Sequence, residues 1–480
     1  MVSTLEAGQI EKIVAQVVAQ VRAKRGLSSV PPGPQGGKRV GIHPDVDQAV
    51  NAARAGFQQL DGLPLALREE IVRHMRQAAR ESAQVLAFEA WSETGMGRYE
   101  DKIQKNILVA EKTPGTEIVR PEVFTGDHGL TLVERAPYGV IGSITPCTNP
   151  TSTILNNAIG MVAAGNAAVF NVHPAAKKVS AHTIAILNEA IIQAGGPRDL
   201  LTCVAEPTIE SAKELMRHPG VDLLVVTGGE AVVHEAMRSG KKAICAGPGN
   251  PPVVVDETAD LAAAARDIVL GASFDNNVIC VDEKEVFVVA GVADQLKAEM
   301  RSLGVVEINS WQLNRLLKAI FVENRGSGQQ GVLNKQFVGQ NAGVLLQEIG
   351  LSAGDEVRLV ITEVDDPRHP LVWTEQLMPV LPIVRVKSAQ QGIDLAVEAE
   401  HGFRHTASMF SRNIDHLSAM ARAFQGSIFV KNGPNIAGLG ADGEGFTSFT
   451  IASPTGEGLT TALTFTRVRR CVLKDCFRII

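Results

Sequence analysis

One cysteine, Cys280, is the residue in this sequence best placed to do chemistry. It follows the turn-forming residues Asp275, Asn276 and Asn277 and precedes a charged and then apolar segment, within SFDNNVICVDEKEV at residues 273–286. A packed structural cysteine usually lies inside an apolar run, so we expect this thiol to be presented rather than buried. The free backbone N–H groups of the turn can lower its pKa and hold an oxyanion. These residues predict a nucleophilic thiolate; the alternative is a loop cysteine without a function.

Two other stretches have the order strand, turn, helix, which is the repeating unit of a doubly wound α/β sheet. They span residues 158–190 and 221–240. Ligands of such sheets bind at the carboxyl ends of the strands, and a helix that begins after glycines offers free N–H groups to a pyrophosphate. The full G-x-G-x-x-G fingerprint is absent. The signal therefore comes from the two turns, which are His173-Pro174 and Thr227-Gly228-Gly229.

Four more segments supply candidate site residues. Residues 129–153 alternate as a strand, break at Pro137, and then run apolar into a Pro-Cys-Thr-Asn-Pro turn, in which Cys147 is expected to be a small filler. The other segments are KKAICAGPGNPPVVV at 241–255, WTEQLMPVLPIVRV at 373–386 and HGFRHTASMFSRN at 401–413.

Together these stretches resemble the aldehyde dehydrogenase superfamily, and specifically its branch that transfers the acyl group to coenzyme A. The likeness covers residues 41–480. Within that branch the chain is most similar to the propionaldehyde dehydrogenases of bacterial microcompartments, with the acetaldehyde enzymes of ethanolamine use second. The resemblance implies NAD and coenzyme A as cofactors, a small aldehyde as substrate and a thioester formed on Cys280.

The resemblance also implies a role for each candidate residue. Cys280 is the nucleophile, its backbone N–H together with the Asn149 side chain holds the oxyanion, and His405 shuttles the thiol proton, with a structural histidine as the alternative. Hydrolytic relatives carry their oxyanion asparagine two places after the proline, which is Thr148 in this chain. The residues expected to contact the cofactors are Thr145, Pro146, His173, Pro174, Thr227, Gly228, Gly229, Gly247, Glu375 and Leu377. Taken without the resemblance, His173 would be structural and Glu375 an exposed, solvated carboxylate.

Residues 241–255 depart from the hydrolytic members of this family. There the family pattern is E-L-G-G-K-x-P, whose glutamate activates the water that hydrolyses the thioester. Alignment on Gly249 and Pro252 puts Ala246 at the glutamate position. Loss of the base disfavours hydrolysis, whereas a thiol is far more nucleophilic than water and is already partly ionised near neutral pH. The residues therefore favour transfer of the acyl group to coenzyme A.

Three alternatives remain beside this prediction. A hydrolytic aldehyde dehydrogenase is disfavoured by Ala246. Histidinol dehydrogenase has a Gly-Pro-Gly-Asn loop like residues 247–250, but it needs a metal, and no cluster of His and carboxylate residues stands out in the sequence. From another class, the chain could be a non-catalytic shell-binding scaffold with a degenerate dehydrogenase body, which would bind cofactor without turnover.

Composition and charge disfavour several other classes. With 480 residues, 45% hydrophobic and 20% charged, the chain has enough material for two or three domains of a globular protein. A net charge of -6 with scattered Lys and Arg gives no electrostatic footprint for nucleic acid. No continuous apolar run is long enough to span a membrane, and no signal peptide begins the sequence. The six cysteines lack C-x-x-C spacing, which favours a reduced cytosolic setting over a zinc site or a disulfide framework.

The first residues are expected to form a tethered amphipathic helix. Apolar residues from Leu5 to Val21 recur at helical spacing within residues 1–26, and the Pro- and Gly-rich residues 27–37 predict a flexible linker. Such a helix needs a partner for its apolar face: its own domain, a membrane surface or another protein. It resembles the encapsulation peptides of microcompartment enzymes, which bind shell or core proteins by helix-in-groove contact. That likeness implies a location in the microcompartment lumen, within the cytoplasm.

The expected architecture is α/β, an aldehyde dehydrogenase-like fold with a doubly wound cofactor-binding domain, an α/β catalytic domain and an oligomerisation hairpin. Residues 46–111 have helical patterns and open the first domain as scaffold. The domain limits implied are 38–115 and 137–246 for NAD and coenzyme A, 247–454 for catalysis, and 116–136 with 455–480 for oligomerisation. The alternating strand near the chain end is expected to pair with another subunit's hairpin, which makes the protein a homo-oligomer.

Overall fold

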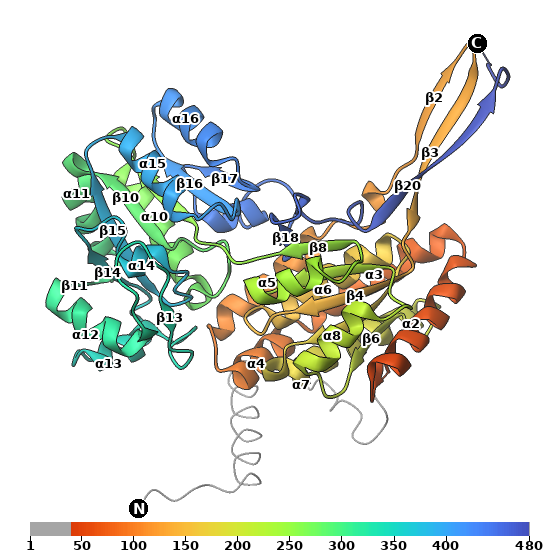
Figure 1. Ribbon diagram of the computed structural model, residues 1–480, viewed down its shortest axis with the longest axis horizontal. Helices are drawn as coiled ribbons and strands as arrows, with labels where there is room; N and C mark the ends of the chain where they lie inside the picture. Colours follow the sequence, from red (N-terminus) through yellow and green to blue (C-terminus); the bar gives the residue numbers. More distant parts are fainter. Residues whose placement is uncertain (1–39, 480) are drawn as a thin grey trace, which may run out of the picture. The chain divides into compact units, whose positions relative to one another are not determined.

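A computed structural model describes residues 40–479, and its first lobe is built on a parallel sheet (Figure 1). The strands lie in the order β1, β6, β5, β4, β7, β8, and every neighbouring pair is parallel. Sequences such as VIGSIT and AAVFNV are buried along their whole length, as expected for a sheet covered on both faces. The strands are β1 (Ile42–His43), β4 (Val140–Thr145), β5 (Ala167–Val172), β6 (Leu201–Val204), β7 (Leu223–Thr227) and β8 (Ala243–Ala246).

Helices pack around this first sheet. The sequence predicted helices over residues 46–111, and α2 to α5 confirm that prediction. The side chain of Asp45 caps α2 by accepting a hydrogen bond from the backbone N–H of Gln48, and α6 begins with Pro150 at its first position. The helices are α2 (Val46–Asp61), α3 (Leu65–Glu81), α4 (Ala83–Thr94), α5 (Tyr99–Lys112), α6 (Pro150–Ala163), α7 (Lys177–Gln193), α8 (Ile209–Arg217) and α9 (Glu230–Met237), with short 3-10 turns η1 (Thr116–Ile118) and η2 (Pro174–Ala176).

The order of the strands fixes where a ligand can bind to this sheet. The chain runs from β4 to β5 and β6 on one side, and then places β7 and β8 on the other side of β4. The crevice outside the carboxyl ends of β4 and β7, where the direction of winding reverses, is the usual ligand position in such sheets. Thr145 ends β4 and Thr227 ends β7, so both lie at this edge.

The second lobe is also built on a parallel sheet, which lies beside α10, α11 and α15 in Figure 1. Its strands lie in the order β11, β14, β15, β10, β9, β16, β17. They are β9 (Pro252–Val255), β10 (Glu285–Val289), β11 (Val306–Ile308), β14 (Val360–Glu363), β15 (Val380–Val386), β16 (Thr406–Phe410) and β17 (Ile428–Lys431). A short antiparallel pair, β12 (Phe321–Glu323) and β13 (Val332–Leu333), lies apart from the sheet.

The helices of the second lobe bury two apolar cores, one against each face of the sheet. They are α10 (Leu261–Ser273), α11 (Ala290–Ser302), α12 (Ser310–Ile320), α13 (Ala342–Glu348), α14 (Pro370–Trp373), α15 (Ala389–Ala399) and α16 (Ile414–Phe424). The turn that carries the candidate nucleophile, η3 (Phe274–Asn277), follows α10 directly.

After β17 the chain returns to the first lobe. Leu439, Phe449 and Phe465 are buried in the core of the first sheet, and the backbone N–H of Thr447 donates to the carbonyl of Lys112. The elements of this segment are η4 (Asn435–Leu439), β18 (Ile451–Ala452) and β19 (Gly458–Leu459). Phe449 and Phe465 thus pack with the first lobe, whereas η4 also packs against β16 and β17 of the second sheet. The limit of the catalytic domain at residue 454 stays a prediction.

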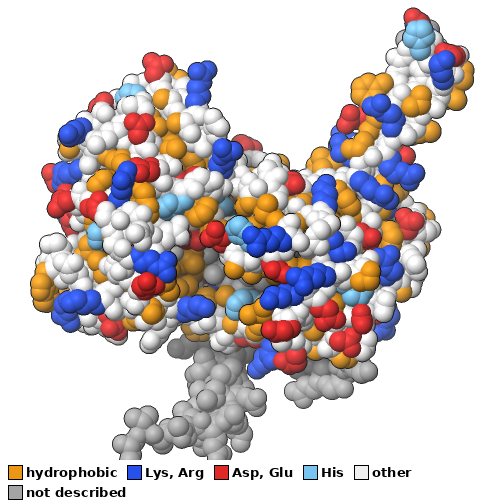
Figure 2. All heavy atoms as spheres, viewed as in Figure 1, with side chains coloured by type: hydrophobic (Ala, Val, Ile, Leu, Met, Phe, Trp, Pro, Cys, Tyr) orange, Lys and Arg blue, Asp and Glu red, His pale blue; other side chains and the backbone are white. Residues whose placement is uncertain are grey.

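A separate antiparallel sheet joins the middle and the end of the chain. It consists of β2 (Glu122–Gly126), β3 (Gly129–Pro137) and β20 (Thr466–Lys474), which lie side by side in Figure 1. β20 pairs along its whole length with β3 of its own chain and forms one edge of this sheet. Pairing of its other edge with another subunit's hairpin stays a prediction. Most residues of this sheet are exposed, and Figure 2 shows apolar side chains on it among Lys and Arg.

The α/β fold class with a doubly wound first sheet is confirmed. The predicted helix at residues 1–26 and the linker at 27–37 lie outside the described residues. Within the described part of the chain, no helix is both long and apolar enough to cross a membrane.

Candidate active site

Cys280 lies in a loop whose preceding turn is buried and strained. Asp275, Asn276 and Asn277 have φ angles of 45°, 55° and 65°, and all three are almost fully inaccessible to solvent. The left-handed region is unfavourable for non-glycine residues, so surrounding contacts must hold the turn in place. Cys280 itself is partly exposed. The sequence predicted the turn correctly but gave no sign that it would be enclosed.

The thiol of Cys280 has a raised pKa, and the expectation that the turn would lower it is wrong. Burial is the main cause and raises the pKa to about 12, with a further increase from the carboxylate of Glu375. Its own backbone N–H lowers the pKa, but the N–H of Asp275 is not free because it donates to Asp101 Oδ2 at 2.8 Å. The positive group that stabilises the thiolate is the ammonium of Lys284.

Lys284 is fully buried behind the loop. Its Nζ donates to the carbonyl of Asn277 at 2.9 Å, to the Asn277 side chain at 2.6 Å and to the carbonyl of Ile279 at 3.2 Å. Burial raises the pKa of the neighbouring carboxyl of Glu283 to about 8. Sequence reasoning missed Lys284, although a run of four charged residues, 282–285, at the start of a buried strand was a visible signal.

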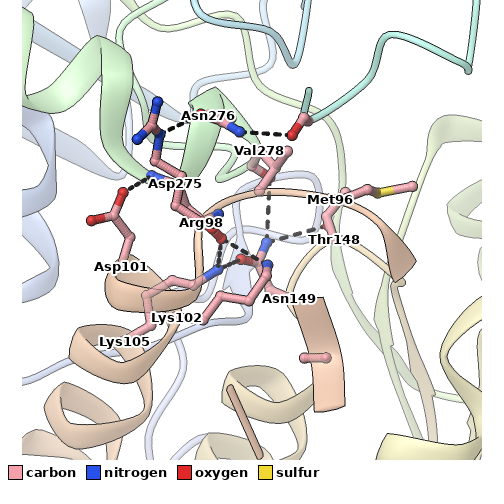
Figure 3. Close-up of polar contacts among 12 residues, drawn as sticks. Met96, Arg98, Asp101, Lys102, Lys105, Thr148, Asn149, Asp275, Asn276 and Val278 are labelled. Carbon is pink, nitrogen blue, oxygen red and sulfur yellow. Dashed lines mark hydrogen bonds and ion pairs between the residues drawn. The ribbon is translucent and has the colours of Figure 1, made fainter. Parts of the chain in front are cut away.

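Helix α5 of the first lobe holds the strained turn (Figure 3). Lys102 Nζ donates to Asp275 Oδ2 at 3.0 Å, and the backbone N–H of Arg98, just before the helix, donates to Asp275 Oδ1 at 2.7 Å. The Arg98 side chain donates to Asn276 Oδ1 at 2.9 Å. A helix predicted to be plain scaffold therefore shapes the loop of Cys280.

Asn149 lies against the same loop. It precedes α6, is 7% exposed, and its Nδ2 donates to the carbonyl of Val278 at 3.4 Å and to Thr148 Oγ1 at 3.2 Å. Lys105 Nζ donates to Asn149 Oδ1 at 2.6 Å and also contacts Asp275. The structure thus brings Asn149 next to the Cys280 loop, as the oxyanion role requires. Thr148 has its hydroxyl occupied by Asn149.

His405 and Glu375 converge on the glycine loop beside Cys280. A Cβ at Gly249 would lie 2.6 Å from the carbonyl oxygen of Cys280 and 3.1 Å from His405 Cγ, and the Gly249 N–H donates to Glu375 Oε1 at 3.4 Å. Only glycine fits between these groups. Burial lowers the pKa of His405 to about 3, so the ring is neutral, and its Nε2 is buried without a hydrogen-bond partner.

Of the two carboxylates that raise the pKa of the Cys280 thiol, Glu375 and Asp282, Glu375 has the larger effect. Burial raises the pKa of its carboxyl to about 7, so it exchanges protons near neutral pH. Ala246 ends β8 and is buried, so the place where hydrolytic relatives have glutamate carries no carboxylate. Leu377, two residues on, has a φ of 53° and packs against the core of the second lobe.

The other predicted cofactor residues line the carboxyl edge of the first sheet. The hydroxyl of Thr145 is buried without a hydrogen-bond partner, next to Pro146. Helix α9 has Gly229 as its N-cap residue without a side-chain cap, and a Cβ at Gly229 would meet no atom within 4 Å. Gly247 packs against Pro454, and Thr227 Oγ1 bonds Thr450 Oγ1 at 2.8 Å.

His173 and Pro174 form the first turn after β5, and both are exposed. The Nδ1 of His173 accepts the N–H of Ala175 at 3.1 Å, and partial burial and the charge of Lys335 lower its pKa. Lys335 comes from the second lobe and also lowers the pKa of the Cys147 thiol. Burial raises that pKa by more, so the net shift is upward. No contact joins His173 to the Cys280 loop, so the predicted residues form two groups, one at the nucleophile and one along the sheet edge.

The fit to a dinucleotide or to coenzyme A rests on this sheet edge. An uncapped helix N-terminus is an anion-binding position, and an unpartnered buried hydroxyl marks a place where a ligand can complete the hydrogen bonding. Both features lie at the carboxyl ends of β4 and β7, where the winding reverses. The residues present therefore fit a ligand with a pyrophosphate group.

Comparison with known proteins agrees with this geometry. Residues 39–446 match the model of the aldehyde dehydrogenase family. The chain is 50% identical over 468 residues to the acetylating acetaldehyde dehydrogenase EutE of Salmonella typhimurium, which covers 97% of this chain and 99% of that one.

Two solved structures are similar over most of the chain. One is a propionaldehyde dehydrogenase from the fucose utilisation bacterial microcompartment of Clostridium phytofermentans, with a TM-score of 0.89 and 45% identity over 92% of this chain and 100% of that one. The other is a propionaldehyde dehydrogenase of Rhodopseudomonas palustris with bound CoA and an acylated cysteine, with a TM-score of 0.88 and 46% identity over 91% of this chain and 98% of that one. This chain therefore belongs to the aldehyde dehydrogenase family.

Proposed function

We propose that the protein oxidises a short aldehyde to an acyl group and transfers that group to coenzyme A, with NAD as the second cofactor. The observation that carries the proposal is the pairing of a cysteine loop built for a nucleophile with Ala246 at the position where hydrolysis needs a base. The similar enzyme with bound CoA and an acylated cysteine supports the same chemistry.

In the first half-reaction Cys280 attacks the carbonyl carbon of the aldehyde. Lys284 stabilises the thiolate, and the Asn149 amide and the Cys280 backbone N–H are the donors for the oxyanion that forms. Glu375, with its pKa of about 7, is a suitable acceptor for the thiol proton. NAD, when bound along the first sheet, supplies the acceptor for the hydride. Loss of that hydride leaves a thioester on Cys280.

In the second half-reaction the thioester is passed to the thiol of coenzyme A. His405 is neutral and has an unpartnered Nε2 beside Gly249, which suits it to take the proton of the incoming thiol. Collapse of the second oxyanion returns Cys280 to its free form. NAD and coenzyme A both contain an adenosine diphosphate group. Both can therefore use the edge at α9 and Thr145 in turn, which gives a ping-pong order.

The preferred aldehyde in this proposal is propionaldehyde, with acetaldehyde as the second candidate. The structural likeness to propionaldehyde enzymes supports the first. The 50% identity to an acetylating acetaldehyde dehydrogenase favours the second. One methylene group in a hydrophobic pocket changes binding by only about 1–3 kcal/mol, so both aldehydes are expected to react.

The proposed assembly is a homo-oligomer inside a bacterial microcompartment. The sheet of β2, β3 and β20 exposes Phe124, Val468 and Val472 on one face. An apolar face of this kind can pack against a second copy of the chain. Residues 1–26 would bind a shell or core protein, and the microcompartment origin of the similar Clostridium enzyme supports that location.

The test is formation of NADH from propionaldehyde and from acetaldehyde, with and without coenzyme A, with the acyl product identified by mass. Turnover that requires coenzyme A and yields acyl-CoA is the expected result, and Cys280→Ala should abolish turnover while leaving NAD binding intact. Free acid formed at the same rate without coenzyme A would overturn the acyl transfer. NAD binding with no turnover by the unmodified chain would point instead to the scaffold.

A further inference from the structure

We propose that Lys105 is a positioning residue: by holding the oxygen of the Asn149 amide, it turns the NH2 group of that amide toward the oxyanion formed at Cys280. The inference rests on the proposed function, because it presupposes that an oxyanion forms there. It assigns a task to a lysine on a helix that otherwise looks like scaffold.

The geometry of Lys105 leaves the amide one orientation. Lys105 is 2% exposed, and its Nζ lies 2.6 Å from Asn149 Oδ1 (Figure 3). An ammonium group has three donors and no acceptor, so the Asn149 oxygen must face it and the NH2 group must face the opposite way. On that opposite side lie the carbonyl of Val278 and the hydroxyl of Thr148.

The same ammonium is fixed by the strained turn. Asp275 Oδ2 accepts from both Lys105 and Lys102, and its Oδ1 accepts the backbone N–H of Arg98. Lys105 therefore connects the turn before Cys280 with Asn149. The direction of the amide and the position of the nucleophile are set by one buried network.

Lys102 provides a matched comparison. It lies one turn earlier on the same helix, is equally buried, and bonds the same oxygen of Asp275, but its ammonium does not hydrogen-bond Asn149. A change that only weakens the hold on Asp275 should affect both lysines alike. A change that misdirects the Asn149 amide should affect Lys105 alone.

The experiment is a double-mutant cycle read by single-turnover NADH formation at saturating aldehyde and NAD. Removal of one oxyanion donor typically lowers kcat by about 10²- to 10³-fold, and we expect a loss in that range for Asn149→Ala. Lys105→Met should lower kcat by about tenfold or more with little change in KM. Adding Lys105→Met to Asn149→Ala should have almost no further effect, because the amide it positions is gone.

Two measurements separate positioning from a structural role. Alkylation of Cys280 by iodoacetamide forms no oxyanion. In Lys105→Met the rate of this alkylation should therefore stay within about threefold of that of the unmodified chain, while the rate of acylation by aldehyde falls. The loss of kcat caused by Lys102→Met should instead multiply with the loss caused by Asn149→Ala. If Lys105→Met fails to fold by thermal unfolding, Lys105→Gln keeps an N–H donor without the charge and enters the same cycle.

The outcomes are distinct. An unchanged kcat in Lys105→Met, or losses that multiply with Asn149→Ala as they do for Lys102→Met, would overturn the positioning role. Full activity in Asn149→Ala would overturn it too, while leaving acyl transfer intact. Absence of acyl-CoA formation by the unmodified chain would instead overturn the proposed function itself.

Discussion

Lys284 contributes the positive charge that favours the Cys280 thiolate. Burial and two carboxylates, Glu375 and Asp282, raise the pKa of the thiol, and this ammonium and the backbone N–H of Cys280 oppose them. The lysine is itself held by carbonyl oxygens of the loop, so it stays in place when the cysteine titrates. Reactivity of the cysteine at neutral pH should therefore depend on this one side chain.

Lys284→Met should shift the pH dependence of Cys280 alkylation to higher pH. An ammonium favours the thiolate, so its removal raises the thiol pKa and lowers the alkylation rate at every pH below it. The measurement is the rate of iodoacetamide labelling of Cys280 between pH 6 and about pH 11, followed by mass spectrometry. Lys112→Met is the matched control, because Lys112 also donates to two backbone carbonyls but lies near Gly440 and Gly443. Identical profiles for the two variants would refute this role of Lys284.

The sequence predicted Cys280, Asn149, Glu375 and His405, and the structure brings all four around one loop. It did not predict the lysines, because a charge inside a helix or at a strand start normally indicates a solvated face. Asp101 and Lys105 do continue the four-residue spacing of buried Val109, which was a signal that this face points inward.

At the scale of elements, the contact between the α4–α5 connection and η3 shapes the site. Gly97 has a φ of 75°, and a Cβ there would lie 2.0 Å from Asp275 Oδ1. The close approach lets the N–H of Arg98 reach the same carboxylate. The connection therefore needs glycine for space as well as for its backbone conformation.

Gly97→Ala should destabilise the protein and lower kcat, because its methyl group displaces Asp275 and with it the turn before Cys280. Gly95→Ala is the matched control: it has a φ of 67° in the same connection but meets no atom within 4 Å. The control should show only the backbone penalty, on the order of 1 kcal/mol, with kcat nearly unchanged. Thermal unfolding and NADH formation measure the two effects. Equal kcat in both variants would contradict this account.

The sheet of β2, β3 and β20 gives a second prediction at this scale. Val472 and Phe124 both lie opposite Thr131, so they share a face, and Val472 is 61% exposed. If a second copy covers that face, Val472→Glu should reduce the mass in light scattering while leaving the melting temperature of the isolated chain almost unchanged. Arg469→Gln, on the other face of β20, is the control. An unchanged mass for Val472→Glu would argue against the contact.

Elements were predictable where the local pattern was strong. The helices of residues 46–111 and the strand–turn–helix units of the first sheet follow from periodicity and turn residues. The strand that pairs with β20 could not be predicted in this way. An alternating strand is compatible with any exposed edge, and its register depends on contacts distant in sequence. The return of the chain to the first lobe, where Phe449 and Phe465 are buried, depends on contacts distant in sequence.

Across the whole molecule, buried carboxylates make stability depend on pH. Glu283 is 1% exposed; it accepts the N–H of Asn435 at 2.7 Å, and burial raises its pKa from 4.5 to about 8. The folded protein thus binds a proton that the unfolded chain releases. The associated stability is fully present below about pH 4.5 and is lost as the pH rises through about 8.

Glu283→Gln should flatten this decline. The amide carries no charge at any pH, so the free energy of unfolding should fall less between pH 5 and pH 8, by about 2 kcal/mol or more, since one pKa unit corresponds to about 1.4 kcal/mol. Chemical unfolding at several pH values measures it. Glu257→Gln, at an exposed position, should leave the pH dependence unchanged. Parallel curves for the two variants would mean that Glu283 is not the group responsible.

The hydrogen bonds between the α5 region and the turn before Cys280 also limit which recombinants of related genes can give an active protein. Arg98 and Asp275 are separated by 177 residues, yet the hydrogen bond between them helps to set the shape of the loop of Cys280. A crossover between two diverged relatives that exchanges only the second lobe would pair one parent's turn with the other parent's helix. Productive chimeras should therefore inherit residues 97–105 and 273–286 from the same parent, whatever else is exchanged.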